Sequence, residues 1–278
     1  MPELPEVETV RQTLRPILQG RTITAIDIHW PKIVHMDQVL FCHLLIGARF
    51  HDVERFGKYL FFVFDDEQIL VSHLRMEGKF YYQAEAEPMD KHVHVVFTLD
   101  NGMQLRYHDV RKFGTMELTN RHSLWQLPSL RKLGYEPFQE QATATYLFEK
   151  FQRTQRPIKS VLLDQHVLVG LGNIYVDEVL FRAKIHPLTP AKKLTKSQAE
   201  KILDASVAVL EKAIALGGTT IRTYQSTLGV DGRFQNELQV HTKLGEPCPV
   251  CGTPIEKMKV GGRGTYYCPV CQQEKGDK

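Results

Sequence analysis

The chain has 278 residues, of which 42% are hydrophobic and 24% are charged, with a formal net charge of +3. This composition is typical of a globular protein and excludes a mainly disordered one, and the length suggests two domains. No uncharged apolar run approaches the roughly 18 residues of a membrane span, which excludes a membrane protein. The acidic first residues lack the apolar core of a signal peptide, so we expect a cytoplasmic protein.

A helix followed by short strands is predicted for the first half of the chain. Apolar residues at helical spacing predict a helix over Glu6–Gln19, and another is expected near Asp37–Ile46. Short apolar or alternating runs predict strands around Ile26 and Ile28 and over Tyr59–Phe64, Ile69–Val71, Val93–Leu99 and Met103–Tyr107. Two polar turns, Asp65-Asp66 and Asp100-Asn101-Gly102, indicate hairpins. We interpret this half as a β-sandwich.

The second half of the chain is predicted to be helical. The candidate helices are Thr143–Phe151, Ile158–Gln165, Ile174–Arg182 and Lys196–Leu216. The last of them stops at Gly217-Gly218, since glycine favours the end of a helix. The fold class is therefore α+β, with a β-sandwich and flanking helices at 1–125, a helical domain at 135–235 and a cysteine-bearing segment at 238–272.

Four of the five cysteines are clustered near the C-terminus, as Cys248-x2-Cys251 and Cys268-x2-Cys271. In a cytoplasmic chain this spacing favours a metal site and is typical of a zinc ribbon. Thiolates suit tetrahedral zinc, and a closed set of four leaves no open position for catalysis. We therefore predict one structural zinc ion; free or disulfide-bonded cysteines are the alternative. The remaining cysteine, Cys42, is expected in the core.

Cationic residues between the two cysteine pairs suggest a phosphate-binding hairpin. Lys257, Lys259 and Arg263 lie in or beside the glycine-rich sequence Gly261-Gly262-Arg263-Gly264. A hairpin held by zinc, with positive charges at its tip, suits DNA phosphates. An ordinary solvated turn fits this segment equally well.

A second basic segment precedes a glycine loop. Lys150, Arg153, Arg156 and Lys159 follow one another without an intervening acidic residue. Further along, Gly170-Leu171-Gly172-Asn173 leads into a predicted helix, whose first N–H groups could bind an anion together with the Asn173 side chain. The two features indicate binding to a DNA backbone. A helical hairpin with a solvated face is the alternative.

The N-terminus offers a potential nucleophile. Met1 precedes the small residue Pro2, so we expect Met1 to be removed and Pro2 to carry a free secondary amine. Much of an α-amino group is unprotonated at neutral pH, and it can attack an electrophilic carbon to form an iminium ion. Glu3 could supply a proton if burial keeps it protonated. Viewed alone, this sequence also fits an ordinary terminus.

Motifs along the whole chain resemble the formamidopyrimidine-DNA glycosylase family, bacterial repair enzymes that act on 8-oxoguanine and ring-opened purines. They are Pro2–Thr9, Gly57–Leu60, His73–Gly78, Asp109–Gly114, Gly170–Tyr175, Gly217–Thr220 and Gly261–Thr265. The resemblance runs from Pro2 to Cys271 and is most specific at the start and at the arginine motif. It implies a catalytic β-sandwich, a helix–two-turn–helix DNA-binding domain and a zinc finger. It also implies a monomer that acts on damaged double-stranded DNA in the bacterial cytoplasm, at the nucleoid during repair.

The resemblance implies four catalytic residues. Pro2 would be the Schiff-base nucleophile at C1′ of the damaged nucleotide, and Glu3 would donate a proton to the leaving sugar or base. Lys58 would serve β-elimination and Arg263 would serve δ-elimination, and both would hold phosphate. The expected activity is a bifunctional DNA glycosylase and abasic-site lyase that needs no redox or nucleotide cofactor.

The resemblance also implies contacts to DNA and to the flipped base. The further DNA contacts are His73, His92, Arg111 and Asn173. Because flipping a nucleotide leaves a void in the stack, Met76, Arg111 and Phe113 are suited to fill it as plug, cation and wedge; ordinary core packing is the alternative for Met76 and Phe113. The expected lesion-recognition residues are Glu6, Thr219, Thr220, Ile221, Arg222, Thr223 and Tyr224, although a plain surface loop also fits.

The sequence leaves two rival functions open. An endonuclease VIII-like enzyme would act on oxidised pyrimidines, but Leu4 and the Gly217–Tyr224 loop argue against it. A non-catalytic zinc-ribbon protein that binds DNA would not require Pro2, Glu3 and Lys58 together.

Overall fold

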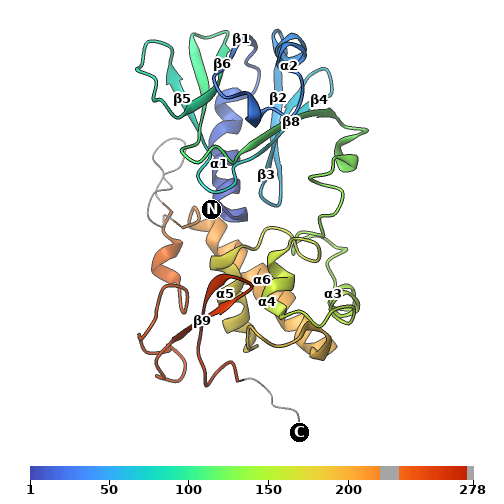
Figure 1. The fold of residues 1–278 in the computed structure, drawn as a ribbon, viewed down its shortest axis with the longest axis vertical. Helices are drawn as coiled ribbons and strands as arrows, with labels where there is room; N and C mark the ends of the chain where they lie inside the picture. The colour runs from blue at the N-terminus through green and yellow to red at the C-terminus, as the bar shows by residue number, and fades with distance from the viewer. Residues whose placement is uncertain (220–231, 274–278) are drawn as a thin grey trace. The chain divides into compact units, whose positions relative to one another are not determined.

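The chain is organised as two compact units, shown in Figure 1. The computed structural model describes residues 1–219 and 232–273. One unit comprises Met1–Arg131 with Gly217–Gly232, and the other comprises Lys132–Leu216 with Arg233–Lys278. Within the described ranges, no helix combines the length and apolar content that crossing a bilayer would require.

Helix α1 (Leu4–Leu18) opens the first unit and begins earlier than Glu6, the predicted start. The backbone N–H of Glu3 donates to the carboxylate of Glu6 at 2.8 Å, and the two residues form a capping box. Such a box satisfies N–H groups that the first turn leaves without helical partners. The helix is therefore fixed at its first turn by two acidic side chains.

Two four-stranded antiparallel sheets form the predicted β-sandwich. The first has the order β1-β6-β7-β5, with strands Ile23–Ile28, Val93–Leu99, Met103–His108 and Lys79–Ala84. The second has the order β2-β3-β4-β8, with strands Phe50–Phe56, Tyr59–Phe64, Gln68–His73 and Thr115–Asn120. The hairpins expected at Asp65-Asp66 and at Asp100–Gly102 join β3 to β4 and β6 to β7.

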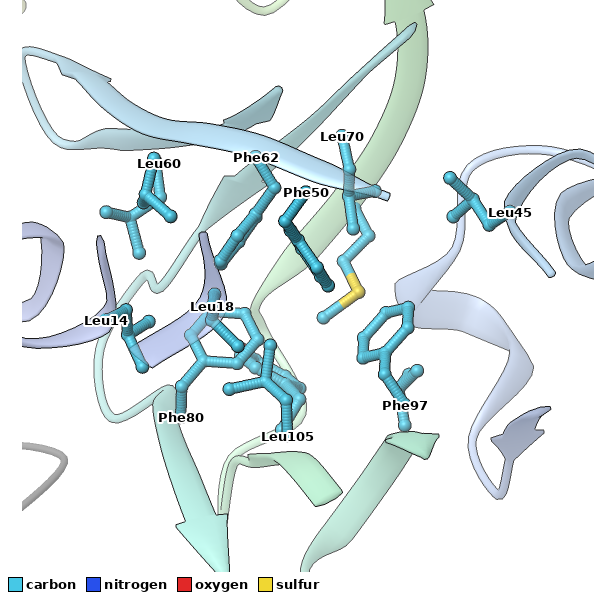
Figure 2. Close-up of a cluster of buried hydrophobic side chains, with 14 of the residues drawn as sticks. Leu14, Leu18, Leu45, Phe50, Leu60, Phe62, Leu70, Phe80, Phe97 and Leu105 are labelled. Atoms are coloured by element: carbon cyan, nitrogen blue, oxygen red, sulfur yellow. The ribbon is translucent and has the colours of Figure 1, made fainter. Parts of the chain in front are cut away.

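Large apolar side chains fill the space between the two sheets. Figure 2 shows Phe50, Leu60, Phe62 and Leu70 from one sheet facing Phe80, Phe97 and Leu105 from the other, with Leu14 and Leu18 of α1 beside them. Leu45 closes the cluster from α2 (Gln38–Leu45), whose N-cap Asp37 accepts from the backbone N–H of Leu40 at 2.9 Å. Cys42, expected in the core, is half-buried and packs against this cluster.

Two short segments cross from one sheet to the other at the same end of the sandwich. Residues 74–78 connect β4 to β5, and residues 109–114 connect β7 to β8. Because β4 pairs with β8 at His73↔Thr115 and β5 pairs with β7 at Lys79↔His108, the two crossovers start and finish beside each other. Met76 lies on the first crossover, and Arg111 and Phe113 lie on the second.

The second unit is built from four α-helices, short turns and one hairpin in its described part. The helices are α3 (Ala144–Phe151), α4 (Ile158–Leu163), α5 (Asn173–Ala183) and α6 (Lys196–Ala215). The hairpin pairs β9 (Glu256–Val260) with β10 (Arg263–Tyr267), and α5 contacts α4, α6 and β10. The four predicted helices are confirmed, with ends that shift by a residue or two.

Candidate functional site

The first turn of α1 gathers the N-terminal candidates into one buried cluster. Pro2 is buried, and Glu3 and Glu6 are only 2% and 4% exposed. The second carboxylate oxygen of Glu6 accepts from the backbone N–H of Thr219 at 2.7 Å and from its hydroxyl at 3.0 Å. Gly218 takes a positive φ of 77°, and a Cβ there would lie 2.6 Å from Glu6 Oε1, so glycine permits this approach. The structure thus brings Pro2, Glu3, Glu6 and Thr219 together.

Lys58 lies in the tight turn between β2 and β3 and is 4% exposed. The preceding residue, Gly57, has a φ of 56°. Arg55 ties this turn to α1, because its guanidinium donates to the carbonyl of Gly57 at 3.0 Å and to the carboxylate of Glu8 at 2.9 Å. Burial alone would raise the pKa of Glu8, but hydrogen bonds from Arg11 and Arg55 outweigh it and hold this pKa below its ordinary value. The turn that carries Lys58 is therefore bound to α1, the helix that Pro2 precedes.

His73 ends β4 and is held as a neutral imidazole. Its burial, followed by the positive charges of Arg75 and Lys58, lowers its pKa to about 3. Its Nδ1 accepts from the backbone N–H of Arg75 at 2.9 Å, so the single proton is assigned to Nε2. The side chain can thus donate one hydrogen bond without carrying charge.

The residues expected to fill a void in DNA lie on the two crossovers. Arg111 is exposed, Phe113 is 53% exposed, and Met76 is half-buried. The guanidinium of Arg111 lies 4.8 Å from the centre of the Phe113 ring. These exposures are unlike those of core residues. His92 is also half-buried and is joined to the second crossover, because its carbonyl accepts from the backbone N–H of Asp109 at 3.0 Å.

Asn173 and Arg263 meet at the hairpin of the second unit. Asn173 begins α5, and its side-chain amide donates to the carbonyl of Gly264 at 3.0 Å. Arg263 is exposed at the start of β10 and precedes that glycine. Lys257 and Lys259 of the partner strand are exposed as well. The glycine loop and the cationic hairpin therefore form one surface.

The prediction that the basic segment is exposed throughout is wrong at Lys159. We expected four surface cations between Lys150 and Lys159, but Lys159 is fully buried. Its ammonium donates to Asp177 Oδ1 at 2.7 Å, to Thr265 Oγ1 at 2.8 Å and to the Gly264 carbonyl at 3.2 Å. Its charge is thus neutralised inside the protein, and it joins α4 to α5 and β10.

Arg156 also departs from the expected basic surface. It forms an ion pair with Asp164 at 2.6 Å, although it remains exposed. Of the four cations, only Lys150 and Arg153 have no ion pair in the described part of the chain that would compete with a phosphate.

Two buried acids on α5, and the histidine His241 that contacts one of them, were not predicted from the sequence. The carboxylate of Glu178 accepts backbone N–H groups of Gln239, Val240 and His241 at 3.0, 3.0 and 2.9 Å. Burial raises the pKa of Glu178, although these three hydrogen bonds oppose it. Asp177 accepts from the His241 ring at 2.8 Å. The signal was faint, since acidic residues inside an apolar helix are ordinarily read as its solvated face.

The four clustered cysteines suit a tetrahedral metal ion. Their sulfur atoms all lie within 4.8 Å of one another, and among the described residues no other group of His, Cys, Asp or Glu is arranged in this way. A hydrogen bond from Thr253 lowers the pKa of Cys251 to about 6, which favours one thiolate at neutral pH. Four thiolate donors fit zinc and leave no coordination position open. The residues Cys248, Cys251, Cys268 and Cys271 therefore hold one structural zinc ion.

Part of the lesion-recognition prediction lies outside the described residues. Thr219 is described and bonded to Glu6. The others, Thr220, Ile221, Arg222, Thr223 and Tyr224, fall in the range 220–231, which is not described.

Three protein-family models match successive parts of the chain. Residues 1–116 match the formamidopyrimidine-DNA glycosylase N-terminal domain, and residues 133–225 match the formamidopyrimidine-DNA glycosylase H2TH domain. Residues 245–273 match a zinc finger found in FPG and IleRS.

Relatives and solved structures match over nearly the whole chain. A formamidopyrimidine-DNA glycosylase of Bacillus cereus is 51% identical over 98% of this chain and 99% of its own length. A protein of the same name from Exiguobacterium is 51% identical over 98% of this chain and 100% of its own. A Lactococcus lactis Fpg bound to DNA with an abasic site superposes with a TM-score of 0.93 at 44% identity, covering 98% and 100% of the two chains. A Lactococcus lactis FPG mutant in complex with Fapy-dG containing DNA gives the same values. The chain belongs to the formamidopyrimidine-DNA glycosylase family.

Proposed function

We propose that the protein is a base-excision repair enzyme that removes oxidised purines, 8-oxoguanine and formamidopyrimidines, from double-stranded DNA and then cleaves the abasic site. The observation that carries this function is the buried cluster at the start of α1, where Pro2 precedes Glu3 and the Glu6 carboxylate fixes the turn. Relatives crystallised with Fapy-dG and abasic-site DNA support the substrate class.

The reaction begins at the nitrogen of Pro2. While Met1 is attached, this nitrogen is an amide with no nucleophilic lone pair, so Met1 must first be removed. The secondary amine then forms a bond to C1′ as the glycosidic bond breaks, and the damaged base leaves with its electron pair. Glu3, which is buried at 2% exposure, donates the proton that the leaving group or opening sugar requires.

Loss of the amine proton and cleavage of the C1′–O4′ bond then leave an iminium ion at C1′, with O4′ taking up a proton. This iminium acidifies the protons at C2′ and prepares the strand for cleavage. Loss of a C2′ proton expels the 3′ phosphate, and a second elimination expels the 5′ phosphate, which leaves a one-nucleotide gap. Lys58, beside the neutral His73, supports the first elimination and holds phosphate. Arg263 supports the second, and Asn173, which is bonded to the neighbouring Gly264, steadies the same backbone. His92 and Arg111 add further DNA contacts.

Zinc supplies no chemistry in this scheme, because its four sulfur ligands close the coordination sphere. When bound, it holds the two cysteine pairs and so the hairpin that presents Arg263. The protein would act as a monomer, since one duplex needs one copy. We place it in the bacterial cytoplasm, at the nucleoid during repair.

Borohydride trapping on a duplex with 8-oxoguanine opposite cytosine tests the nucleophile. Protein without Met1 should form a covalent adduct with the DNA, because borohydride reduces the iminium bond to a stable amine. Protein that retains Met1 should form none, and Pro2→Gly should trap only in part through its own α-amine. The same assay on oxidised pyrimidines separates the endonuclease VIII-like alternative.

A matched control keeps the N-terminus intact. Glu85→Gln changes an exposed acid of the same unit and should trap as well as wild type. Undiminished strand cleavage by protein that retains Met1 would exclude catalysis by Pro2.

A further inference from the structure

The two crossovers at the end of the sandwich share one buried anchor, which the catalytic scheme does not use. Asp109 starts the second crossover and is fully buried. Its carboxylate accepts the backbone N–H groups of Arg111, Phe113 and Gly114 at 3.0, 2.9 and 2.9 Å. One side chain therefore sets the course of the whole segment that displays Arg111 and Phe113.

The hydroxyl of Tyr107 extends this anchor to the first crossover. Tyr107 is fully buried in β7, and its hydroxyl donates to Asp109 Oδ2 at 3.4 Å. A Cβ on Gly114 or on Gly78 would collide with that hydroxyl. The oxygen thus fills the gap between the end of the Met76 crossover and the end of the Arg111 crossover. A Cβ on Gly78 would collide with the Leu74 carbonyl as well.

The backbone of both crossovers is held in an unfavourable conformation. Arg75, next to Met76, has a φ of 52°, and Lys112, between Arg111 and Phe113, has a φ of 58°. Residues with a side chain adopt this left-handed region only when their surroundings over-determine it. Lys112 is further fixed by its ammonium, 3.9 Å from the centre of the Trp30 ring.

We propose that Tyr107 and Asp109 are positioning residues that fix the two crossovers in one arrangement before DNA arrives. Met76, Arg111 and Phe113 would then enter the space of an extruded nucleotide without first being ordered. Ordering a loop at the moment of binding lowers affinity, and a pre-organised loop avoids that cost. The inference rests on the proposed function, since it assigns these three residues to the void in the duplex.

Tyr107→Phe separates this role from ordinary core packing. The Tyr107 ring packs against Phe80 with centroids 5.1 Å apart, and phenylalanine keeps that contact while removing only the hydroxyl. Tyr82→Phe is the matched control, because it removes a hydroxyl that accepts from Asn101 in an exposed hairpin of the same unit. Asp109→Asn is a second variant, which replaces one accepting oxygen with a donor.

The variants are compared on two DNAs and by amide exchange. Excision of 8-oxoguanine from a duplex requires extrusion, whereas a preformed abasic site in single-stranded DNA can be cleaved without filling a void. Tyr107→Phe should slow single-turnover excision about tenfold and leave single-strand cleavage unchanged, and Asp109→Asn should have a larger effect in the same direction. Amide hydrogens of Arg111, Phe113 and Gly114 should exchange faster in both variants. Tyr82→Phe should stay within about twofold of wild type on both DNAs.

Two results would overturn the proposal: duplex excision by Tyr107→Phe as fast as by Tyr82→Phe, or an equal loss on both DNAs. Wild-type protein that cleaves neither DNA would instead overturn the proposed function. In that case unchanged amide exchange in Tyr107→Phe would separately show that the hydroxyl fixes neither crossover.

Discussion

At the scale of single residues, Glu6 joins Glu3, next to the proposed nucleophile Pro2, to the segment predicted to recognise the lesion. One of its oxygens accepts from Glu3, and the other accepts twice from Thr219. The carboxylate therefore needs both oxygens as acceptors, a requirement that glutamine cannot meet. This explains why an acid inside a first helical turn is only 4% exposed.

We expect Glu6→Gln to lower the free energy of unfolding by about 1–3 kcal/mol, because a buried N–H loses its acceptor. Urea denaturation measures the change. The exposed substitution Glu85→Gln should alter it by less than about 0.5 kcal/mol. Equal effects of the two substitutions would show that the bridge to Thr219 adds no stability.

His73 should make the protein less stable in mild acid. Its pKa is about 3 in the folded state, against an ordinary value of 6.5 that applies to the unfolded chain. Between these two pH values His73 is protonated in the unfolded chain and neutral in the folded one. The free energy of unfolding should then fall as the pH drops from 6.5 towards 3, by up to about 1.4 kcal/mol per pH unit from this group.

His73→Asn tests that slope while keeping an acceptor for the Arg75 N–H. Urea denaturation between about pH 4 and about pH 7 should show a flatter acid limb for the variant than for wild type. The control His43→Asn changes an exposed histidine of α2 and should leave the slope unchanged. Parallel profiles for wild type and His73→Asn would contradict the shift.

At the scale of elements, patterns in the sequence predicted those whose apolar residues repeat clearly. The strands Tyr59–Phe64 and Val93–Leu99 were found because nearly every residue in them is buried and apolar. Strand β2 was missed because its outward residues are charged and are paired by the fold, as in Arg15–Asp52 and Arg121–Glu54. Strands β5 and β8, with mixed composition, were missed as well.

Candidate site residues could be read from the sequence where one short motif contains them. Pro2 with Glu3, and the four cysteines, lie within local patterns. The burial of Lys159 was not predictable, because its partner Asp177 comes from another helix and Thr265 from a distant strand. In the sequence Asp109 is likewise typical of a turn. Its role as acceptor of three backbone N–H groups is visible only in the structure.

Loss of zinc should disrupt the segment that carries the four cysteines and leave the stability of the β-sandwich unchanged. We expect wild-type protein to contain about one zinc ion per chain, and Cys271→Ser to lose it and to bind DNA more weakly. Both tryptophans, Trp30 and Trp125, lie in the first unit, so unfolding followed by their fluorescence should be unchanged. Cys42→Ser, outside the quartet, should retain zinc. An unchanged zinc content in Cys271→Ser would exclude the assignment.

At the scale of the whole molecule, a net charge of +3 understates the attraction to DNA. Many cations are paired with acids, such as Arg156 with Asp164 and Lys159 with Asp177. Others are exposed without such a partner in the described structure, among them Lys259 near the hairpin tip. The strength of DNA binding should therefore depend on a few local charges.

Salt dependence distinguishes these local charges from the remainder. Each phosphate contact contributes about 0.9 to the slope of log K against log salt concentration. We expect Lys259→Ala to lower that slope by about this amount and Lys201→Ala, on the exposed face of α6, to leave it unchanged. Fluorescence anisotropy of labelled duplex over a salt series measures both. Equal slopes for the two variants would remove Lys259 from the phosphate contacts.

The two crossovers at the end of the sandwich could be exchanged between homologues as one unit. Their ends are clamped by the pairs His73↔Thr115 and Lys79↔His108, so most residues between the clamps can diverge without disturbing a core strand. The interior constrains Leu74, which packs in the core, and the positions that meet the Tyr107 hydroxyl, namely Gly78, Asp109 and Gly114. Both segments could be grafted together onto another member of the family, which would exchange the residues proposed to enter the duplex while the recipient keeps its own sheets.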